Sequence, residues 1–376
     1  MKYRSFGRTG WNASALAFGC MRLPTLGAPE KVDEQLAIRM IRSAVDAGVN
    51  YVDTAYPYHG GRSEAVLGKA LKDGYRQKVK LADKMPMWLA KEPGDFDRLF
   101  NEQLDRLQTD HVDLYLLHAL SRGTWKKGRE LGVQEWLERQ VAAGRIGWLG
   151  FSFHDELSAF KEIVDAWDRW TFCMIFYNYA SEQVQAGTAG LHYAAGKGLA
   201  VSVMEPLMGG NLVSPPPPVK ALWDKAPKSR TPADWALQWV WNKPEVSTVL
   251  SGMSNMAHVQ ENLASAENAA VGSLSSRELD IVREVAAAYE KLRPIPCTQC
   301  NYCMPCSSGV NIPRVLDVYN KAVAFSNPGE ARREFGFVPP SARAGACTEC
   351  LECEGKCPQD VPVHEWMKRI SAEFGG

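Results

Sequence analysis

Asn50–Gly61 reads N-Y-V-D-T-A-Y-P-Y-H-G-G, and this stretch decides how the whole chain is interpreted. A β-rich run, 49–53, stops at a turn that carries a carboxylate, and Tyr58 follows five residues later. A tyrosine acts as an acid near neutral pH only if its pKa falls from about 10, and a nearby ammonium group lowers it. Lys84 and His118 end the next two predicted strands, so the four titratable groups are interpreted together.

The composition is typical of a soluble globular protein, with 45% hydrophobic and 23% charged residues. Lys plus Arg and Asp plus Glu are equal at 43 each, so the charge balance favours neither nucleic acid nor an anionic membrane surface as a partner. No apolar signal core and no membrane-spanning apolar run is visible, so we expect a cytoplasmic protein. Thiols stay reduced there, and clustered cysteines then indicate metal ligands rather than disulfides.

Strands and helices alternate regularly along the first two thirds of the chain. The predicted strands are 15–19, 49–53, 79–84, 112–118, 146–151, 172–177, 199–204 and 246–251, and a helix is predicted after each one. Continuous apolar strands in regular alternation with helices imply parallel strands buried on both faces. Eight such units over about 250 residues match a closed (β/α)8 TIM barrel, which we place at residues 1–292.

An open, doubly wound sheet is the competing α/β fold. It would carry a glycine-rich dinucleotide fingerprint after the first strand, but residues 18–22 read F-G-C-M-R. In a barrel, functional residues lie at the C-terminal ends of the strands. Asp53, Lys84 and His118 end the second, third and fourth strands, and Tyr58 follows the second. Each residue alone has an ordinary structural explanation, but their shared position at one mouth favours a catalytic site.

These residues resemble the motifs of the aldo-keto reductase family. The matching motifs run in the right order from residue 1 to about 290: D-T-A-x-x-Y at 53–58, L-A-D-K at 81–84, D-L-Y-L-L-H at 113–118, G-F-S at 150–152, Y-N at 177–178, E-P-L at 205–207 and E-N-L at 261–263. The resemblance implies hydride transfer between a nicotinamide and the carbonyl carbon of a small aldehyde or ketone, or the reverse oxidation of an alcohol. It also implies that Tyr58 donates a proton and that Lys84 lowers its pKa. Asp53 would hold Lys84, and His118 would orient the carbonyl oxygen.

The resemblance further implies a site for NAD(H) or NADP(H). The expected cofactor contacts are Met21, Asp53, Ser152, Glu205, Pro206, Leu207, Ser254, Glu261 and Asn262. Two cations common in the family are missing, because residues 251–255 read S-G-M-S-N without the lysine and His258 replaces the arginine. A 2′-phosphate carries close to two negative charges, so these losses weaken the case for strict use of NADP.

The composition changes after residue 292, where R-P-I-P at 293–296 indicates a linker. Two runs follow and contain eight of the ten cysteines: Cys297, Cys300, Cys303, Cys306, and Cys347, Cys350, Cys353, Cys357. The second run has the spacing of a bacterial ferredoxin motif, in which the fourth cysteine binds the other cluster. By that rule one [4Fe–4S] cluster takes Cys357 with the first three cysteines of the first run. The second takes Cys306 with the first three of the second run.

The first run departs from the motif, because its last gap is two residues and Ser307 stands where proline is usual. Residues 313–324 and 330–335 are predicted to be helical, so residues 293–376 resemble the helical two-cluster ferredoxins. Aldo-keto reductases with such a C-terminal domain form a subgroup that this chain resembles over its full length. The alternative is two structural zinc sites with four cysteine ligands each, although zinc modules usually show separated C-x2-C pairs.

Three functions stay open at this stage. The barrel can reduce a carbonyl compound with nicotinamide while the clusters are structural. The clusters can instead pass electrons between an external one-electron carrier and the barrel. A hydride moves two electrons together, so this second function needs a splitting cofactor such as flavin, for which no fingerprint is visible. A non-catalytic redox sensor is the third, and the complete set of four titratable residues argues against it.

Overall fold

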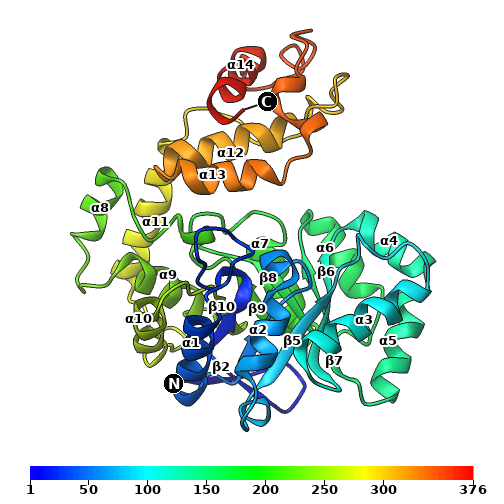
Figure 1. Ribbon diagram of the computed structural model, residues 1–376. Coiled ribbons are helices and arrows are strands. Elements are labelled where there is room, and N and C mark those ends of the chain that lie inside the picture. The colour runs from blue at the N-terminus through cyan, green and yellow to red at the C-terminus, as the bar shows by residue number, and fades with distance from the viewer. Residues whose placement is uncertain (376) are drawn as a thin grey trace. The chain divides into compact units, whose positions relative to one another are not determined.

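The computed structural model describes residues 1–375 and contains the predicted closed barrel of eight parallel strands (Figure 1). The strands follow one another in chain order around the barrel. The last strand, β10, pairs with both β9 and the first barrel strand, β3, and this closes the barrel. The barrel strands are β3 (Leu16–Gly19), β4 (Tyr51–Asp53), β5 (Lys80–Met85), β6 (Val112–Leu120), β7 (Ile146–Phe153), β8 (Phe172–Phe176), β9 (Ala200–Met204) and β10 (Val246–Ser251).

Helices surround the barrel in the order predicted. They are α1 (Glu34–Asp46), α2 (Ser63–Ala70), α3 (Gly94–Leu107), α4 (Arg122–Glu130), α5 (Val133–Ala142), α6 (Leu157–Asp165), α7 (Gly187–Gly196), α9 (Pro232–Trp241) and α10 (Met256–Ala266). The Asp33 side chain caps the start of α1 by accepting the Leu36 N–H at 3.0 Å. α4 was not predicted, since its two glycines conceal a helix that Ser121 and Thr124 begin with a reciprocal cap.

The N-terminal hairpin closes one end of the barrel. β1 (Tyr3–Ser5) and β2 (Asn12–Ser14) pair antiparallel, and Phe6 between them packs in one apolar cluster with Tyr51 and Phe172, the first residues of β4 and β8. The Phe6 ring lies 5.4 Å from Phe172 and 6.0 Å from Tyr51. This cluster fills the end where the parallel strands begin, so the opposite end is left for the functional loops.

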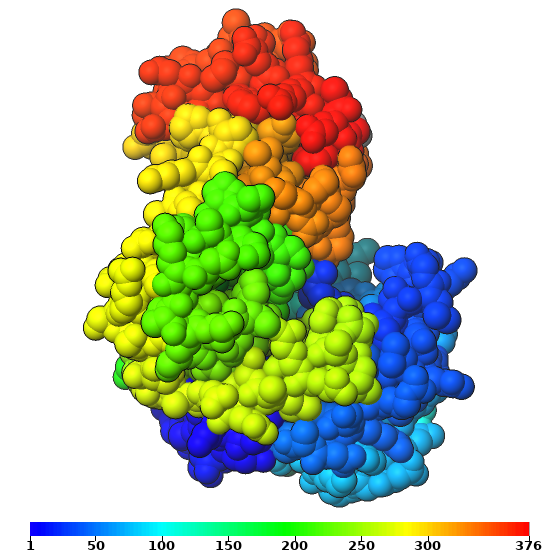
Figure 2. All heavy atoms as spheres, turned by 90° about the vertical axis from the view of Figure 1, so that its left-hand side faces the viewer, coloured from blue at the N-terminus to red at the C-terminus, as the bar shows by residue number. Residues whose placement is uncertain are grey.

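The chain divides into two compact units. The first comprises Met1–Leu207 and Ala233–Ser275, and the second comprises Met208–Pro232 and the chain from Ser276 onward. Within the second unit, α8 (Pro217–Trp223) packs against α11 (Ser276–Lys291), as Figures 1 and 2 show in green and yellow. The compact units therefore cut the chain at other positions than the limits 1–292 and 293–376, which stay a prediction of domain organisation.

The second unit is mainly helical, as expected. Besides α8 and α11 it contains α12 (Ile312–Ala324), α13 (Pro328–Gly336) and α14 (Val363–Phe374), of which α14 was not predicted. A buried apolar core joins these three helices, and six of the cysteines pack partly buried against it: Cys297, Cys303, Cys306, Cys347, Cys353 and Cys357. No helix within residues 1–375 is long and apolar enough to cross a membrane.

Gly68 tests how tightly α2 packs on α3. A Cβ at Gly68 would lie 2.5 Å from the Leu107 carbonyl oxygen, which is backbone and cannot move aside. Gly68→Ala should therefore destabilise the barrel by about 1–3 kcal/mol, although alanine normally stabilises a helix. Thermal unfolding followed by near-UV circular dichroism measures the effect. Gly196→Ala on α7 is the matched control, since nothing lies within 4 Å of its Cβ. An unchanged midpoint for Gly68→Ala would contradict the packing.

Candidate active site

A buried ion pair joins the ends of two neighbouring strands. Lys84 of β5 and Asp53 of β4 are only 1% and 3% exposed. The Lys84 Nζ donates to Asp53 Oδ1 at 2.5 Å, to the Thr54 carbonyl oxygen at 2.7 Å and to the Tyr58 hydroxyl at 3.4 Å. One ammonium group thus contacts two of the three other members of the predicted set, and all three of its hydrogens have acceptors.

The strand register explains why these side chains meet. Asp53 pairs with Ala82 across β4 and β5, so Lys84 lies two residues beyond the end of β4 and on the same face as Ala82. Ala82 belongs to the apolar cluster inside the barrel, so the Lys84 side chain also points inward, near the mouth. Tyr58 begins a short turn in which His59 and Gly60 have positive φ values of 53° and 62°. This turn brings the phenol back over the strand ends.

Burial and the partner's charge shift the pKa values of Lys84 and Asp53 in opposite directions. Burial alone would lower the pKa of Lys84, but Asp53 and Tyr58 outweigh it and the pKa is raised. Burial also raises the pKa of Asp53, and the Lys84 ammonium opposes that shift. The raised pKa of Lys84 favours a charged amine, whereas the raised pKa of Asp53 favours a neutral carboxyl group. We take the pair as charged, because the 2.5 Å distance is typical of a charge-assisted hydrogen bond and an ammonium group has a further hydrogen for the Thr54 carbonyl.

The prediction that Lys84 makes Tyr58 a stronger acid needs correction. Burial raises the pKa of Tyr58 above its ordinary value, and Lys84 only opposes this shift. The direction of the lysine's effect is as predicted, but the net pKa is not lowered. The phenol therefore keeps its proton at neutral pH, and it can act as an acid only toward an oxygen more basic than a phenolate, such as an alkoxide. Sequence reasoning missed this outcome because the burial of a hydroxyl cannot be read from its neighbours in the chain.

His118 of β6 is a neutral imidazole beside the phenol. Burial, Lys84 and His154 lower its pKa well below the usual value. Its ring meets Tyr58 edge-on, with centroids 6.0 Å apart, and lies 5.1 Å from the ring of the half-exposed Trp88. The Nδ1 atom has no hydrogen-bond partner within residues 1–375. The structure thus brings all four predicted catalytic residues to one place, with the Trp88 ring against His118.

The predicted cofactor contacts all lie at the same end of the barrel. Met21 follows β3, Ser152 lies in β7, residues 205–207 follow β9, and Ser254, Glu261 and Asn262 follow β10. Several are already engaged within the protein. The Ser152 hydroxyl accepts the Ala119 N–H at 2.8 Å, and the Asn262 amide donates to Ser251 Oγ at 2.7 Å. Glu205 has a positive φ of 53°, a conformation that is costly for a non-glycine residue.

The loop after β10 lacks the lysine that is common in the family, and the side chain of Arg22 packs against it. A Cβ at Gly252 would come within 3.2 Å of the Arg22 Cβ and Cγ atoms, so the Arg22 stem occupies the space that a longer residue would need. His258 is held by its neighbours, with Nδ1 3.3 Å from Ser254 Oγ and Nε2 3.2 Å from Asn255 Nδ2. Arg22 was not among the predicted cofactor contacts, and no signal in the sequence placed it beside residue 252.

The eight clustered cysteines divide between two cavities of the second unit. One cavity is lined by Cys297, Cys300, Cys303 and Cys357. The other is lined by Cys306, Cys347, Cys350 and Cys353, and also by Cys303. With Cys303 assigned to the first cavity, the lining agrees with the crossed division that the ferredoxin spacing predicts, in which each set of four thiols would hold one [4Fe–4S] cluster. No three His, Cys, Asp or Glu side chains of residues 1–375 converge closely enough for a single metal ion, an arrangement that a multi-atom cluster does not need.

Comparison with known proteins agrees with both halves of the chain. The aldo/keto reductase family profile matches residues 15–287, and a 4Fe-4S dicluster domain profile matches residues 296–362. L-galactose dehydrogenase of Arabidopsis thaliana is 29% identical over 323 residues, which cover 78% of this chain and 96% of that protein. The uncharacterized oxidoreductase YrpG of Bacillus subtilis is 30% identical over 56% of this chain and 68% of its own length.

Solved structures give the same answer for the barrel. The holo form of aldo-keto reductase AKR11C1 from Bacillus halodurans is similar with a TM-score of 0.62 and 27% identity, covering 76% of this chain and 96% of that chain. The thermostable aldo-keto reductase Tm1743 shares the fold with a TM-score of 0.62 over 76% of this chain and 100% of its own. The chain therefore belongs to the aldo/keto reductase family of oxidoreductases and carries a 4Fe-4S dicluster domain at its C-terminal end.

Proposed function

We propose that the barrel catalyses nicotinamide-dependent reduction of a small aldehyde or ketone, or the reverse oxidation of an alcohol. The observation that carries this proposal is the buried Lys84 ammonium, held between Asp53 and the Tyr58 hydroxyl next to a neutral His118. A bound nicotinamide would supply the hydride. The residues named above as contacts would hold it at the C-terminal ends of the strands.

In this mechanism the protein handles the proton. The carbonyl oxygen of the substrate would lie between Tyr58 and His118, because these side chains face each other across the mouth. Neutral His118 retains one ring N–H that can donate to this oxygen. Tyr58 then transfers its proton as negative charge develops on the oxygen. Lys84 stabilises the phenolate that results, and Asp53 prevents the ammonium from turning away.

We further propose that the second unit holds two [4Fe–4S] clusters with the crossed ligand sets that line its two cavities. The clusters would supply one-electron chemistry. Cys300 and Cys350 are exposed, one in each set, so each cluster would reach the surface. This exposure favours a second candidate function, in which an external one-electron carrier exchanges electrons with the clusters.

The exchange of Tyr58 for phenylalanine tests the catalytic assignment. Tyr58→Phe removes the transferable proton, and kcat for carbonyl reduction should fall by about two orders of magnitude or more. Nucleotide binding should be retained. Tyr56→Phe is the matched control from the same loop, since its hydroxyl binds Glu102 at 2.7 Å and not Lys84. Turnover of Tyr58→Phe within about threefold of wild type would refute a general acid role.

Metal analysis of anaerobically prepared protein tests the clusters. Two [4Fe–4S] clusters correspond to about eight iron and eight acid-labile sulfide per chain. Cys306→Ser should lose the cluster of the cavity that Cys306 lines and keep the cluster of the other, because Cys306 lines only one of the two. Zinc at about two per chain without iron would instead support zinc sites with four cysteine ligands each. Survival of both clusters in Cys306→Ser would contradict the crossed ligand set.

The nucleotide preference follows from the loop after β10. Residues 251–258 contain no lysine or arginine, and His258 is bound to its neighbours, so the loop itself offers little charge to a 2′-phosphate. Arg22 is the cation that packs against this loop, through its stem at Gly252. We expect NADH to bind at least as well as NADPH. His258→Arg should shift the ratio of dissociation constants toward NADPH, by up to about 1.5–3 kcal/mol for a charged hydrogen bond. Quenching of tryptophan fluorescence measures both constants. His192→Arg on α7 is the control, and NADPH binding more than about tenfold tighter than NADH in the wild type would overturn the proposal.

A further inference from the structure

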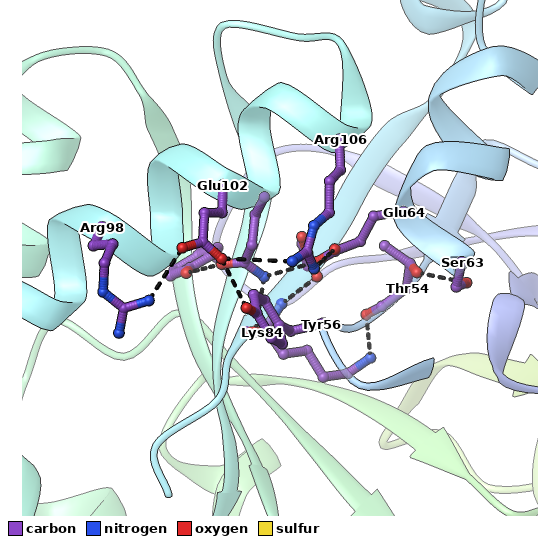
Figure 3. A network of polar contacts seen from close by, with 11 residues as sticks. Thr54, Tyr56, Ser63, Glu64, Lys84, Arg98, Glu102 and Arg106 are labelled. Atoms are coloured by element: carbon purple, nitrogen blue, oxygen red, sulfur yellow. Dashed lines mark hydrogen bonds and ion pairs between the residues drawn. The ribbon is translucent and has the colours of Figure 1, made fainter. Parts of the chain in front are cut away.

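A second carboxyl group lies directly behind the catalytic lysine. Asp83 precedes Lys84 on β5, and successive side chains of a strand point to opposite faces, so Asp83 points away from the barrel interior toward the helices. There it meets Glu64 of α2, which Figure 3 shows beside Arg106 of α3. Both carboxyl groups are 0% exposed. The proposed mechanism gives neither of them a role.

The donors around this pair are too few for two carboxylates. Glu64 accepts from Arg106 Nη1 at 2.8 Å and from Gln103 Nε2 at 3.3 Å. Asp83 Oδ1 accepts the Lys84 N–H at 2.8 Å, but Asp83 Oδ2 has no donor within residues 1–375. An unsatisfied carboxylate oxygen in a fully buried site is costly. Asp83 and Glu64 contact each other, and two acceptors form a hydrogen bond only if one of them carries a proton.

The surrounding charges favour a neutral Asp83. The titratable groups near it are Glu64, Lys84, Tyr58, Tyr115 and Cys20. Lys84 is the only cation among them, and its ammonium is bound to Asp53. Arg106 already compensates Glu64. Burial first, and then the Glu64 charge, raise the pKa of Asp83 well above its usual value.

The same network fixes the backbone of Lys84. The Ala82 carbonyl accepts the Thr54 N–H at 3.0 Å, so the peptide groups of Ala82 face the end of β4. Peptide groups two residues apart in a strand face the same side, so those of Lys84 point to this side too, beyond the last residue of β4. Because β4 ends at Asp53, its strand does not continue far enough to pair with these backbone groups of Lys84. Asp83 satisfies the Lys84 N–H, and Gln103 Nε2 donates to the Lys84 carbonyl at 3.0 Å. Tyr115 holds Gln103 in turn with a hydroxyl contact of 2.6 Å.

We infer that Asp83 and Glu64 hold one proton between them, and that Asp83, together with Gln103, positions Lys84 toward Asp53 and Tyr58. Asp83 is a positioning residue, since it reaches the site only through the backbone of Lys84. Its effect on turnover rests on the function proposed above, whereas the shared proton does not.

The pH dependence of stability tests the shared proton. A carboxyl group whose pKa is raised by folding stabilises the native state at low pH, and this contribution is lost as pH rises through the raised pKa. Asp83→Asn keeps the shape without the titration. Its unfolding midpoint should therefore rise relative to wild type, by at least about 2 °C between pH 6 and pH 9. Differential scanning calorimetry of the anaerobic holoprotein measures it.

Asp113 provides the matched control from the neighbouring strand. It is also buried, but Arg76 and Lys80 each contact it at 2.8 Å. Burial acts to raise the pKa of Asp113, and the two cations outweigh it and lower the pKa. Asp113→Asn should therefore lower the midpoint throughout this range, with a difference that shrinks only in acid. A flat or falling difference for Asp83→Asn would overturn the shared proton.

Turnover tests the positioning role. Asp83→Ala removes the acceptor of the Lys84 N–H, and kcat should fall between about tenfold and a hundredfold while the dissociation constant of the nucleotide changes little. Asp83→Asn should recover most of this loss. Equal kcat values for Asp83→Ala and wild type would refute the role, and Asp83→Ser replaces Asp83→Ala if the latter does not fold. If wild type reduces no carbonyl compound, the proposed function fails and the stability measurement still decides the shared proton.

Discussion

The candidate active site depends on one buried ammonium group, that of Lys84. A lysine with 1% exposure is stable only if its charge is compensated, and Asp53 and the Thr54 carbonyl provide this compensation at 2.5 and 2.7 Å. Removing one partner of a buried ion pair typically costs about 3–5 kcal/mol, because the other charge is left unpaired. The ion pair therefore also constrains the fold, because it forms only when β4 and β5 pair in the observed register and the Tyr58 turn lies over their ends.

A barrel meets this constraint better than an open sheet would. In a closed parallel barrel, every strand ends at the same mouth, so β4, β5 and β6 deliver Asp53, Lys84 and His118 to neighbouring positions. The N-terminal hairpin fills the other end with apolar side chains. Behind the mouth, the network of Glu64, Asp83, Gln103 and Arg106 completes the hydrogen bonding of the backbone where β4 has ended. The catalytic layer is thus supported from the helix side as well as from the barrel interior.

The second unit also depends on contacts between segments that are distant in the sequence. Its helices build a small apolar core, and the cysteines pack against that core from two separate runs of the chain. Each proposed ligand set takes three thiols from one run and one from the other, so neither set would exist until both runs are folded onto α12 and α14. Cluster binding and folding of this unit are therefore expected to be coupled.

The sequence by itself determined the barrel, and it predicted both the four residues that meet at its mouth and the crossed division of the cysteines. These features are local: apolar runs alternate with amphipathic ones, each titratable residue lies near or just after the end of a strand, and ligand spacing repeats over a few residues. α4 escaped prediction because its two glycines weaken the helix signal, whereas α14 was missed although Val363, Met367 and Ile370 recur at helical spacing. The grouping of residues 208–232 with the C-terminal unit escaped it as well, since it arises from the contact of α8 with α11.

Only the tertiary structure decided the electrostatics. The net pKa of Tyr58 is raised rather than lowered, Gly252 lies against the stem of Arg22, and Asp83 meets Glu64 nineteen residues earlier in the chain. The physical reason is common to all three. A pKa or a close approach depends on how much solvent is excluded and on which charges lie within a few ångströms, and both are sums over segments distant in sequence. Motifs name the groups that take part, and the folded environment determines the direction in which each one titrates.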